Sequence, residues 1–338
     1  MGILRRALIV VVLLAGIAIG APPEGRRIAL PKGAGGVGLD DMKYAPGLGA
    51  VVVPAGRTGM IDLIDPKTGA ITSIGGFSTS AAGTDHGEGT TSADEGDGFL
   101  FATDRTTREL VVVAEAAPKI VARVKLAGSP DYVRWVEATH EIWVTEPDAA
   151  RIEVFRLGSG FPPAPRSVFS IAVPGGPESL VIDGARGRAY SNLWKAETVA
   201  IDLKSRKIAA RWANACGGAR GLALDGRRGF LLVACTEGKA LSIDVESGKA
   251  LSTAAVPAGV DIIDFDASLS HLYVPGARDA SMAVVAVSAR GDLSVLGNLP
   301  TAERSHCVAV APGGEIFVCD PRAGAVLAFH DPYPAEKP

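Results

Sequence analysis

Short runs of alternating apolar and small or polar residues fill most of this chain, with turn residues between them. Residues 219–259 show the pattern most clearly, because the runs GLALD, FLLVAC, ALSID and ALSTAAVPAG are separated by the turns DGRRG, TEGK and ESGK. A period of two predicts β-strands, and Asp and Gly in the short connections predict tight turns. No segment shows a convincing apolar period of 3.6 residues. We therefore expect an all-β protein made of four-stranded antiparallel units.

The four-stranded unit recurs seven times along the chain. Matching its innermost strand to the rest of the sequence gives seven equivalent positions where that strand begins: Asp40, Glu88, Asp131, Glu178, Arg220, Asp261 and His306. Their separations run from 41 residues (Arg220 to Asp261) to 48 residues (Asp40 to Glu88). Four strands at a period of about 40 to 50 residues are typical of a β-propeller.

The two ends of the repeat region complement each other. The last unit supplies only three strands, SHCVAVA, GEIFVCD and AVLAFH, whereas residues 26–36, RRIALPKGAGG, look like a fourth strand without a unit of its own. Pairing the two would close the ring and remove an open sheet edge. We predict a single seven-bladed β-propeller over residues 26–331, with the N-terminal strand completing the last blade, followed by a polar tail over residues 332–338.

The repeats contain the segments PDYVRW, EIWVTEP, GLALDGRRGFLLVAC, SIDVESGKAL, HLYVPG and HCVAVAPGGEIFVCDP. These segments resemble the repeats of the YVTN β-propeller family, which are exported seven-bladed propellers of bacteria and archaea. The literal tetrapeptide YVTN does not occur in this chain. The resemblance implies the propeller architecture and no particular reaction, because propellers carry many unrelated functions.

Residues 1–20 differ in composition from the rest of the chain. Arg5 and Arg6 precede an apolar run over residues 7–20, which ends in the small residues Ala18 and Gly20 that suit signal peptidase. We expect a cleaved export signal over residues 1–20, with an uncleaved anchor as the alternative. The run is short for a membrane span, and no other segment approaches 18 apolar residues. The mature chain is therefore expected in the periplasm or secreted, without a transmembrane span.

Four cysteines fit an oxidising compartment. Cys216 and Cys235 bracket one inner hairpin, and Cys307 and Cys319 lie in another, on either side of the turn PGG. A three-residue loop at PGG would place Cys307 opposite Cys319, whereas a two-residue loop would put them on opposite faces. Of the three possible pairings we expect the local one, with four buried thiols as the alternative. The spacing does not resemble the CxxC pattern of zinc or redox sites.

Charge excludes one class of partner. The chain has 34 Lys and Arg against 37 Asp and Glu, a formal net charge of −3, so it has no polybasic surface for nucleic acid. We expect a monomer.

The most specific prediction concerns the central channel of the propeller. Loops entering the first strand and leaving the second gather on one face, so the seven equivalent positions should place five carboxylates, Arg220 and His306 around one mouth. The loop GTDHGEG adds Asp85 and His86 beside Glu88, among glycines that allow a close approach to a ligand.

This mouth has three chemical interpretations. Its carboxylates could bind Ca²⁺, for which the candidate ligands are Glu88, Asp131, Glu178 and Asp261. It could instead hold a small cationic or polar ligand, or be a solvated rim without a partner. His86 beside His306 could also form a two-histidine, one-carboxylate site for a transition metal, although no HExxH pattern supports it.

Two functional classes follow from these interpretations. The first is an exported, non-enzymatic binding or scaffold protein that holds a protein, glycan or small ligand at the loop face. The alternative is an enzyme, either a metal-dependent, lactonase-like hydrolase or a propeller similar to the quinoprotein dehydrogenases. Arg220 opposes a central cation, and the sequence contains no GxSxG, P-loop or CxxCH motif.

Overall fold

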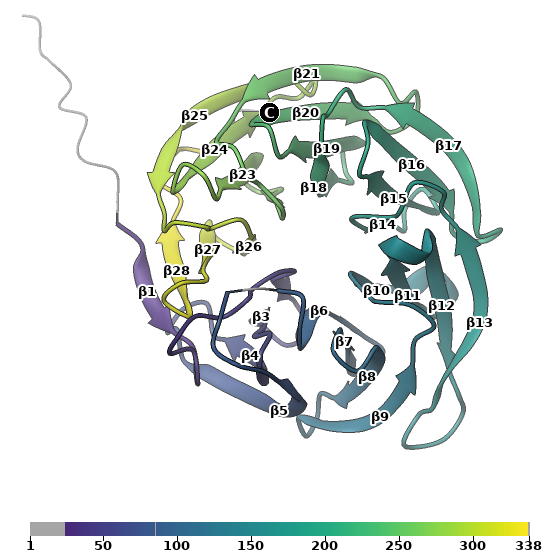
Figure 1. The fold of residues 1–338 in the computed structure, drawn as a ribbon. Coiled ribbons are helices and arrows are strands. Elements are labelled where there is room, and N and C mark those ends of the chain that lie inside the picture. Colours follow the sequence, from purple (N-terminus) through teal and green to yellow (C-terminus); the bar gives the residue numbers. More distant parts are fainter. Residues whose placement is uncertain (1–23, 85, 337–338) are drawn as a thin grey trace, which may run out of the picture.

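The computed structural model describes residues 24–84 and 86–336, so the predicted export signal and Asp85 lie outside the described residues. Its strands form seven four-stranded antiparallel sheets arranged as the blades of a ring around a central channel (Figure 1). This confirms the seven-bladed β-propeller predicted from the repeats. Among the described residues, no helix has the length and apolar character needed to cross a bilayer.

Each blade runs from an inner strand at the channel to an outer strand at the rim (Figure 1). Blade one consists of β2 (Lys43–Ala45), β3 (Ala50–Pro54), β4 (Thr58–Ile64) and β5 (Ile71–Thr79). Blade two consists of β6 (Thr90–Gly96), β7 (Phe99–Asp104), β8 (Glu109–Ala114) and β9 (Lys119–Lys125). Blade three consists of β10 (Val133–Val136), β11 (Glu141–Glu146), β12 (Arg151–Leu157) and β13 (Pro165–Ala172). Two single-turn 3-10 helices, η1 (Glu137–Thr139) and η2 (Pro147–Ala149), flank β11.

The remaining blades follow the same plan. Blade four consists of β14 (Val181–Asp183), β15 (Arg188–Leu193), β16 (Glu197–Asp202) and β17 (Lys207–Ala213). Blade five consists of β18 (Ala219–Asp225), β19 (Phe230–Cys235), β20 (Lys239–Asp244) and β21 (Ala250–Ala255). Blade six consists of β22 (Asp264–Asp266), β23 (His271–Gly276), β24 (Ser281–Val287) and β25 (Leu293–Pro300). Blade seven combines β26 (Val308–Ala311), β27 (Glu315–Asp320) and β28 (Ala325–His330) with β1 (Arg26–Ala29).

Burial along the strands explains their composition. Every residue of β19 and of β23 is buried, because each is the second strand of its blade and is covered by a neighbouring blade on both faces. The outer strands β17 and β21 alternate between exposed and partly buried residues, since only one of their faces meets another blade. The pattern of apolar residues in a strand therefore depends on the place of that strand in its blade.

The N-terminal strand closes the ring as predicted. β1 pairs antiparallel with β28, with Arg26 opposite Ala328 and Ala29 opposite Ala325. Ile28 is the buried residue of β1 and belongs to the same apolar cluster as its cross-strand partner, Val326. The first strand of the propeller thus covers the edge that its last hairpin would otherwise expose.

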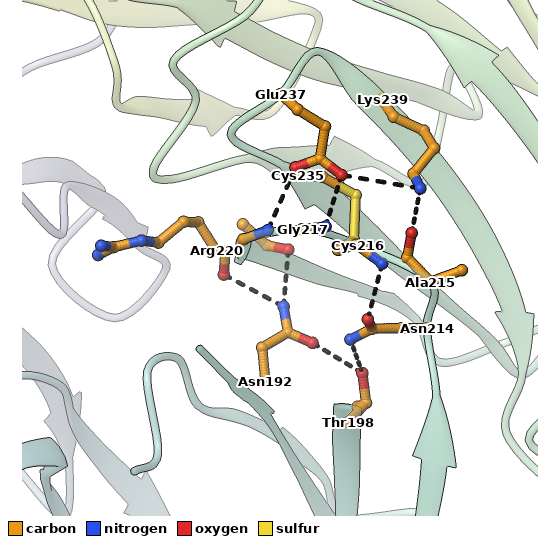
Figure 2. The surroundings of a disulfide bond; sticks show 12 residues. Asn192, Thr198, Asn214, Ala215, Cys216, Gly217, Arg220, Cys235, Glu237 and Lys239 are labelled. Atoms are coloured by element: carbon orange, nitrogen blue, oxygen red, sulfur yellow. Dashed lines mark hydrogen bonds and ion pairs between the residues drawn. A yellow bond between two sulfur atoms is a disulfide. The ribbon is translucent and has the colours of Figure 1, made fainter. Parts of the chain in front are cut away.

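The cysteines follow the predicted local pairing in one hairpin only. Cys216 and Cys235 form a disulfide (Figure 2). Ala311 pairs with Glu315, so the loop at PGG has the three residues that bring Cys307 opposite Cys319, yet both remain free, buried thiols. The predicted second disulfide is therefore wrong. The Cys319 sulfur instead accepts hydrogen bonds from the backbone N–H groups of Cys307 and His306, at 3.1 and 3.3 Å.

Removing the Cys216–Cys235 disulfide is expected to lower the free energy of unfolding by about 3 kcal/mol, because the bridge closes a loop between residues 19 positions apart. The double variant Cys216→Ala/Cys235→Ala, unfolded in urea, measures this loss. Cys307→Ser is the matched control, since it changes a buried cysteine outside the disulfide. An equal loss in the control would contradict this account of the bridge.

Candidate ligand-binding site at the channel mouth

Backbone contacts hold Asp131 and Glu178 just ahead of the inner strands β10 and β14. The N–H group of Asp131 donates to the Thr145 carbonyl at 2.9 Å, and that of Glu178 makes the same contact to Asn192 at 2.9 Å. Five of the seven predicted positions line one cavity of about 320 Å³, which we call the mouth cavity: Asp40, Asp131, Glu178, Arg220 and Asp261. His86 lines it as well.

His306 lies at the edge of this group. It lines an adjoining cavity of about 280 Å³, which we call the side pocket and which shares His86, Arg220 and Asp261 with the mouth cavity. The rings of His86 and His306 are 5.5 Å apart between centroids. The two histidines that the sequence suggested as neighbours therefore lie together.

Glu88 does not take the place predicted for it. Its side chain is exposed and lines neither cavity. In blade two, Thr90 pairs with Asp104 just before a register shift, as Ala219 pairs with Cys235 in blade five. Thr91 is thus the equivalent of Arg220, and Glu88 lies three residues too early in the chain to belong to the ring.

Arg105 also lines the mouth cavity, although the predicted site did not include it. It follows β7, and its guanidinium contacts the carboxylate of Asp131 and lies 3.5 Å from that of Asp40. Its remaining N–H groups donate to the carbonyls of Pro130 and His86, at 2.9 and 2.8 Å. The available signal was its position after a second strand, since those exits gather at the same mouth as the first-strand starts.

Arg220 provides positive charge on the side of the mouth cavity where Glu178 and Asp261 lie. Its guanidinium contacts the Glu178 carboxylate, lies 3.9 Å from Asp261, and sits 5.9 Å from the ring centre of Trp194. Trp194 is 43% exposed, so part of it is open to solvent.

A polar network holds the backbone at Arg220 in place. The side-chain amide of Asn192 donates to the carbonyls of Arg220 and Gly221, at 3.2 and 3.1 Å. Figure 2 shows this network continuing through Thr198 and Asn214 to the backbone N–H of Cys216, beside the disulfide. One hydrogen-bonded network therefore connects the disulfide with the mouth cavity.

Three carboxyl groups of the mouth cavity, those of Asp40, Asp131 and Glu178, have raised pKa values. Burial raises the pKa of Asp40 and of Asp131 to about 7, against the opposing effect of Arg105, and neighbouring carboxylates contribute in the same direction. Burial and the nearby aspartates also raise the pKa of Glu178. The positively charged groups nearby are therefore too few to compensate the negative charge of these carboxyl groups when all of them are ionised.

Ionisation of Asp131 is expected to destabilise the fold between about pH 4 and pH 7. The folded-state pKa of about 7 lies above the 3.8 of an ordinary aspartate, so in this window the folded chain binds more protons than the unfolded chain. Stability must then fall as pH rises. The melting temperature of the wild type, relative to that of Asp131→Asn, should decrease across this window. A difference that increases with pH would contradict the raised pKa.

The donor set does not fit Ca²⁺. A calcium ion takes six to eight oxygen ligands, but the guanidiniums of Arg105 and Arg220 already lie against the carboxylates that would supply them. Of the four candidate ligands, Glu88 lies outside the cavity. His306 is equally unsuited to a two-histidine metal site, because both of its ring nitrogens hydrogen-bond to backbone carbonyls.

Comparisons with known proteins support the fold and do not identify a function. No protein-family model and no curated protein sequence matches this chain. Among solved structures, a chain of hydrazine synthase from Kuenenia stuttgartiensis matches with a TM-score of 0.71 and 12% identity, over 88% of this chain and 96% of that one. A chain of the mitotic checkpoint complex matches with a TM-score of 0.74 and 11% identity, over 98% and 99%.

A third solved structure completes the comparison. The β-propeller domain of Cps50 (Swd1) from Myceliophteria thermophila matches with a TM-score of 0.68 and 12% identity, over 87% of this chain and 98% of that one. At such low identities the three matches demonstrate a shared propeller architecture alone.

Proposed function

We propose that this chain is an exported, non-enzymatic β-propeller that binds a small cationic or polar ligand in the mouth cavity. The single observation that carries this proposal is the imbalance of charge in a cavity of about 320 Å³, where five carboxylates, Asp148 included, face two guanidiniums. A ligand ammonium group would supply the missing positive charge and favour the ionised carboxylates. The partly exposed indole of Trp194 offers a surface for an aromatic or cationic part of the ligand.

Export is part of the same proposal. It is supported by the composition of residues 1–20 and by the Cys216–Cys235 disulfide, a bond that persists in oxidising compartments. The repeat motifs support placing the chain with the YVTN-type propellers. We favour binding over lactonase-like or quinoprotein-like catalysis, because Arg105 and Arg220 lie against carboxylates that would have to coordinate a metal ion, yet leave the cavity with an excess of negative charge for an organic cation.

Calorimetric titration with hexylamine and benzylamine, compared with their neutral analogues hexanol and benzyl alcohol, tests the proposal. The amines should bind about tenfold more tightly than the alcohols, which corresponds to about 1.4 kcal/mol. The double variant Asp131→Asn/Glu178→Gln should abolish this preference, and Trp194→Ala should weaken the binding of benzylamine. Asp292→Asn, which changes an exposed aspartate away from the mouth, is the matched control.

Two results would overturn the proposal. One is the failure of every amine to bind better than its alcohol. The other is a rise in melting temperature with Ca²⁺ that EDTA reverses, which would replace the organic ligand by a metal ion.

A further inference from the structure

The side pocket carries the opposite charge to the mouth cavity. It is lined by Arg220, Arg278, Arg304 and His306, with Asp261 as its one carboxylate among the described lining residues. The two cavities share His86, Arg220 and Asp261, so they are adjoining parts of one depression. An excess of carboxylates on one side therefore meets an excess of cationic groups on the other.

Hydrogen bonds fix the charge of His306. Its Nδ1 lies 2.6 Å from the carbonyl oxygen of Arg304, and its Nε2 lies 2.9 Å from that of Leu39. A carbonyl oxygen only accepts hydrogen bonds, so both ring nitrogens must carry a proton. The ring is an imidazolium, held in place by two segments far apart in the sequence.

A buried sulfur provides the counter-charge. The Cys319 Sγ lies 4.0 Å from Nδ1 of His306 and accepts the backbone N–H groups of His306 and Cys307. Burial by itself would raise the pKa of Cys319, but the Cys307 thiol, the imidazolium and the backbone donors hold it well below its ordinary value. Cys319 is fully buried behind His306, so the thiolate that a lowered pKa favours lies beside the imidazolium and away from solvent.

Two exposed arginines complete the cationic side. Within the described part of the chain, neither Arg278 nor Arg304 has a carboxylate within ion-pair distance. The loops that carry them are joined, since the N–H of Arg304 donates to the Ala277 carbonyl at 3.1 Å. Guanidinium groups bind carboxylates and phosphates with paired hydrogen bonds. The pocket thus presents two such groups beside a fixed imidazolium.

Building on the function proposed above, we propose that the side pocket binds the anionic group, a carboxylate or a phosphate, of the same ligand whose cationic group occupies the mouth cavity. The ligand is then dipolar. Cys319 acts as a positioning residue, because it keeps His306 charged and makes no contact with the ligand itself.

A series of dipolar probes tests this proposal. The probes are glycine, β-alanine, γ-aminobutyrate and ε-aminocaproate, with butylamine and hexylamine as cation-only controls and butyrate and hexanoate as anion-only controls. At least one amino acid of the series should bind about tenfold more tightly than its amine, and affinity should peak at one chain length, which measures the spacing of the two subsites. Phosphoethanolamine replaces the carboxylate by a phosphate, and the tighter of the two binders identifies the anionic group.

Variants assign the effect to the side pocket. Arg278→Gln/Arg304→Gln should reduce the affinity for the dipolar probe to that for the amine, whereas the exposed control Arg322→Gln should leave it unchanged. Cys319→Ser should remove the ultraviolet absorbance of the thiolate and weaken dipolar binding without changing amine binding. Cys307→Ser keeps the Cys319 sulfur and a hydrogen-bond donor beside it, so this variant should retain the thiolate absorbance.

The outcomes separate this proposal from the one on which it depends. If amines bind as tightly as amino acids, the side pocket has no anionic ligand, and the mouth cavity remains a cation site. If no probe of either kind binds, both proposals are wrong. If Cys319→Ser retains the thiolate absorbance, the charge does not reside on this sulfur and its positioning role is disproved.

Discussion

Replacing Arg134 by methionine is expected to lower the free energy of unfolding by about 3–5 kcal/mol, because the change leaves a buried carboxylate without its partner. Arg134 donates to both oxygens of Asp41, at 2.5 and 2.9 Å, and the two side chains are 11% and 4% exposed. Methionine has a similar length and no charge, so it tests the ion pair rather than the packing. Equilibrium unfolding in urea at neutral pH measures the loss.

The position of Arg134 explains the size of this effect. It lies on the inner strand of blade three, its partner Asp41 belongs to blade one, and its Nε donates to the carbonyl of Leu180, next to blade four, at 3.0 Å. Asp41 also accepts the hydroxyl of Ser92 in blade two at 2.5 Å. One charged pair therefore connects four blades across the channel.

Two comparisons isolate the contribution of the buried pair. Arg211→Met removes a half-exposed partner of Glu197 on the outer strands and should cost less than about 1 kcal/mol. Adding Asp41→Asn to Arg134→Met should recover part of the loss, since it removes the uncompensated charge. If Arg211→Met is as destabilising as Arg134→Met, burial is not the cause.

Introducing a charge at Ile28 is expected to destabilise the fold by about 4 kcal/mol and to cause aggregation. Ile28 is 7% exposed and is the residue through which β1 packs on the core. Ile28→Asp places an unpaired carboxylate there, so β1 should detach and expose the edge of β28. Thermal unfolding combined with light scattering measures both effects.

The neighbouring residue in the same strand is the matched control. Ala29 points to solvent, so Ala29→Asp introduces the same charge on the other face of β1 and should change stability by less than about 0.5 kcal/mol. Equal destabilisation by the two substitutions would show that strand pairing is sensitive to charge as such and that burial of Ile28 is not what closes the ring.

Parts of the candidate site were predictable because they repeat. Asp131, Glu178, Arg220 and Asp261 occupy equivalent places in their units, and equivalent places in a propeller converge on the channel. Glu88 was misplaced because the inner strand of blade two, TTSADEG, has almost no apolar residues, so alternation of residue types does not show that it begins at Thr90. Arg105 was not included in the predicted site because its role depends on reaching Asp131 in the next blade, a contact that no spacing within one repeat encodes.

The cysteines also combine a feature that the sequence predicts with one that depends on the tertiary structure. The turn at PGG was enough to predict two opposed residues, Cys307 and Cys319. Whether their sulfurs bond or serve as hydrogen-bond acceptors depends on which donors the surrounding backbone presents, and here two N–H groups point at Cys319. The charge of His306 likewise depends on the carbonyl of Leu39, which the ring brings to it from the opposite end of the chain.

The sequence by itself determined the strands, the seven-fold repeat and the closure of the ring, because these follow from local alternation, turn residues and the need to cover a sheet edge. Only the tertiary structure decided which charged groups lie against one another at the channel mouth. The arrangement of Arg105 against Asp131, of Arg220 against Glu178 and of Cys319 behind His306 arises from contacts between residues distant in the chain. Such contacts depend on burial and on the positions of other blades, which a pattern within one repeat does not specify.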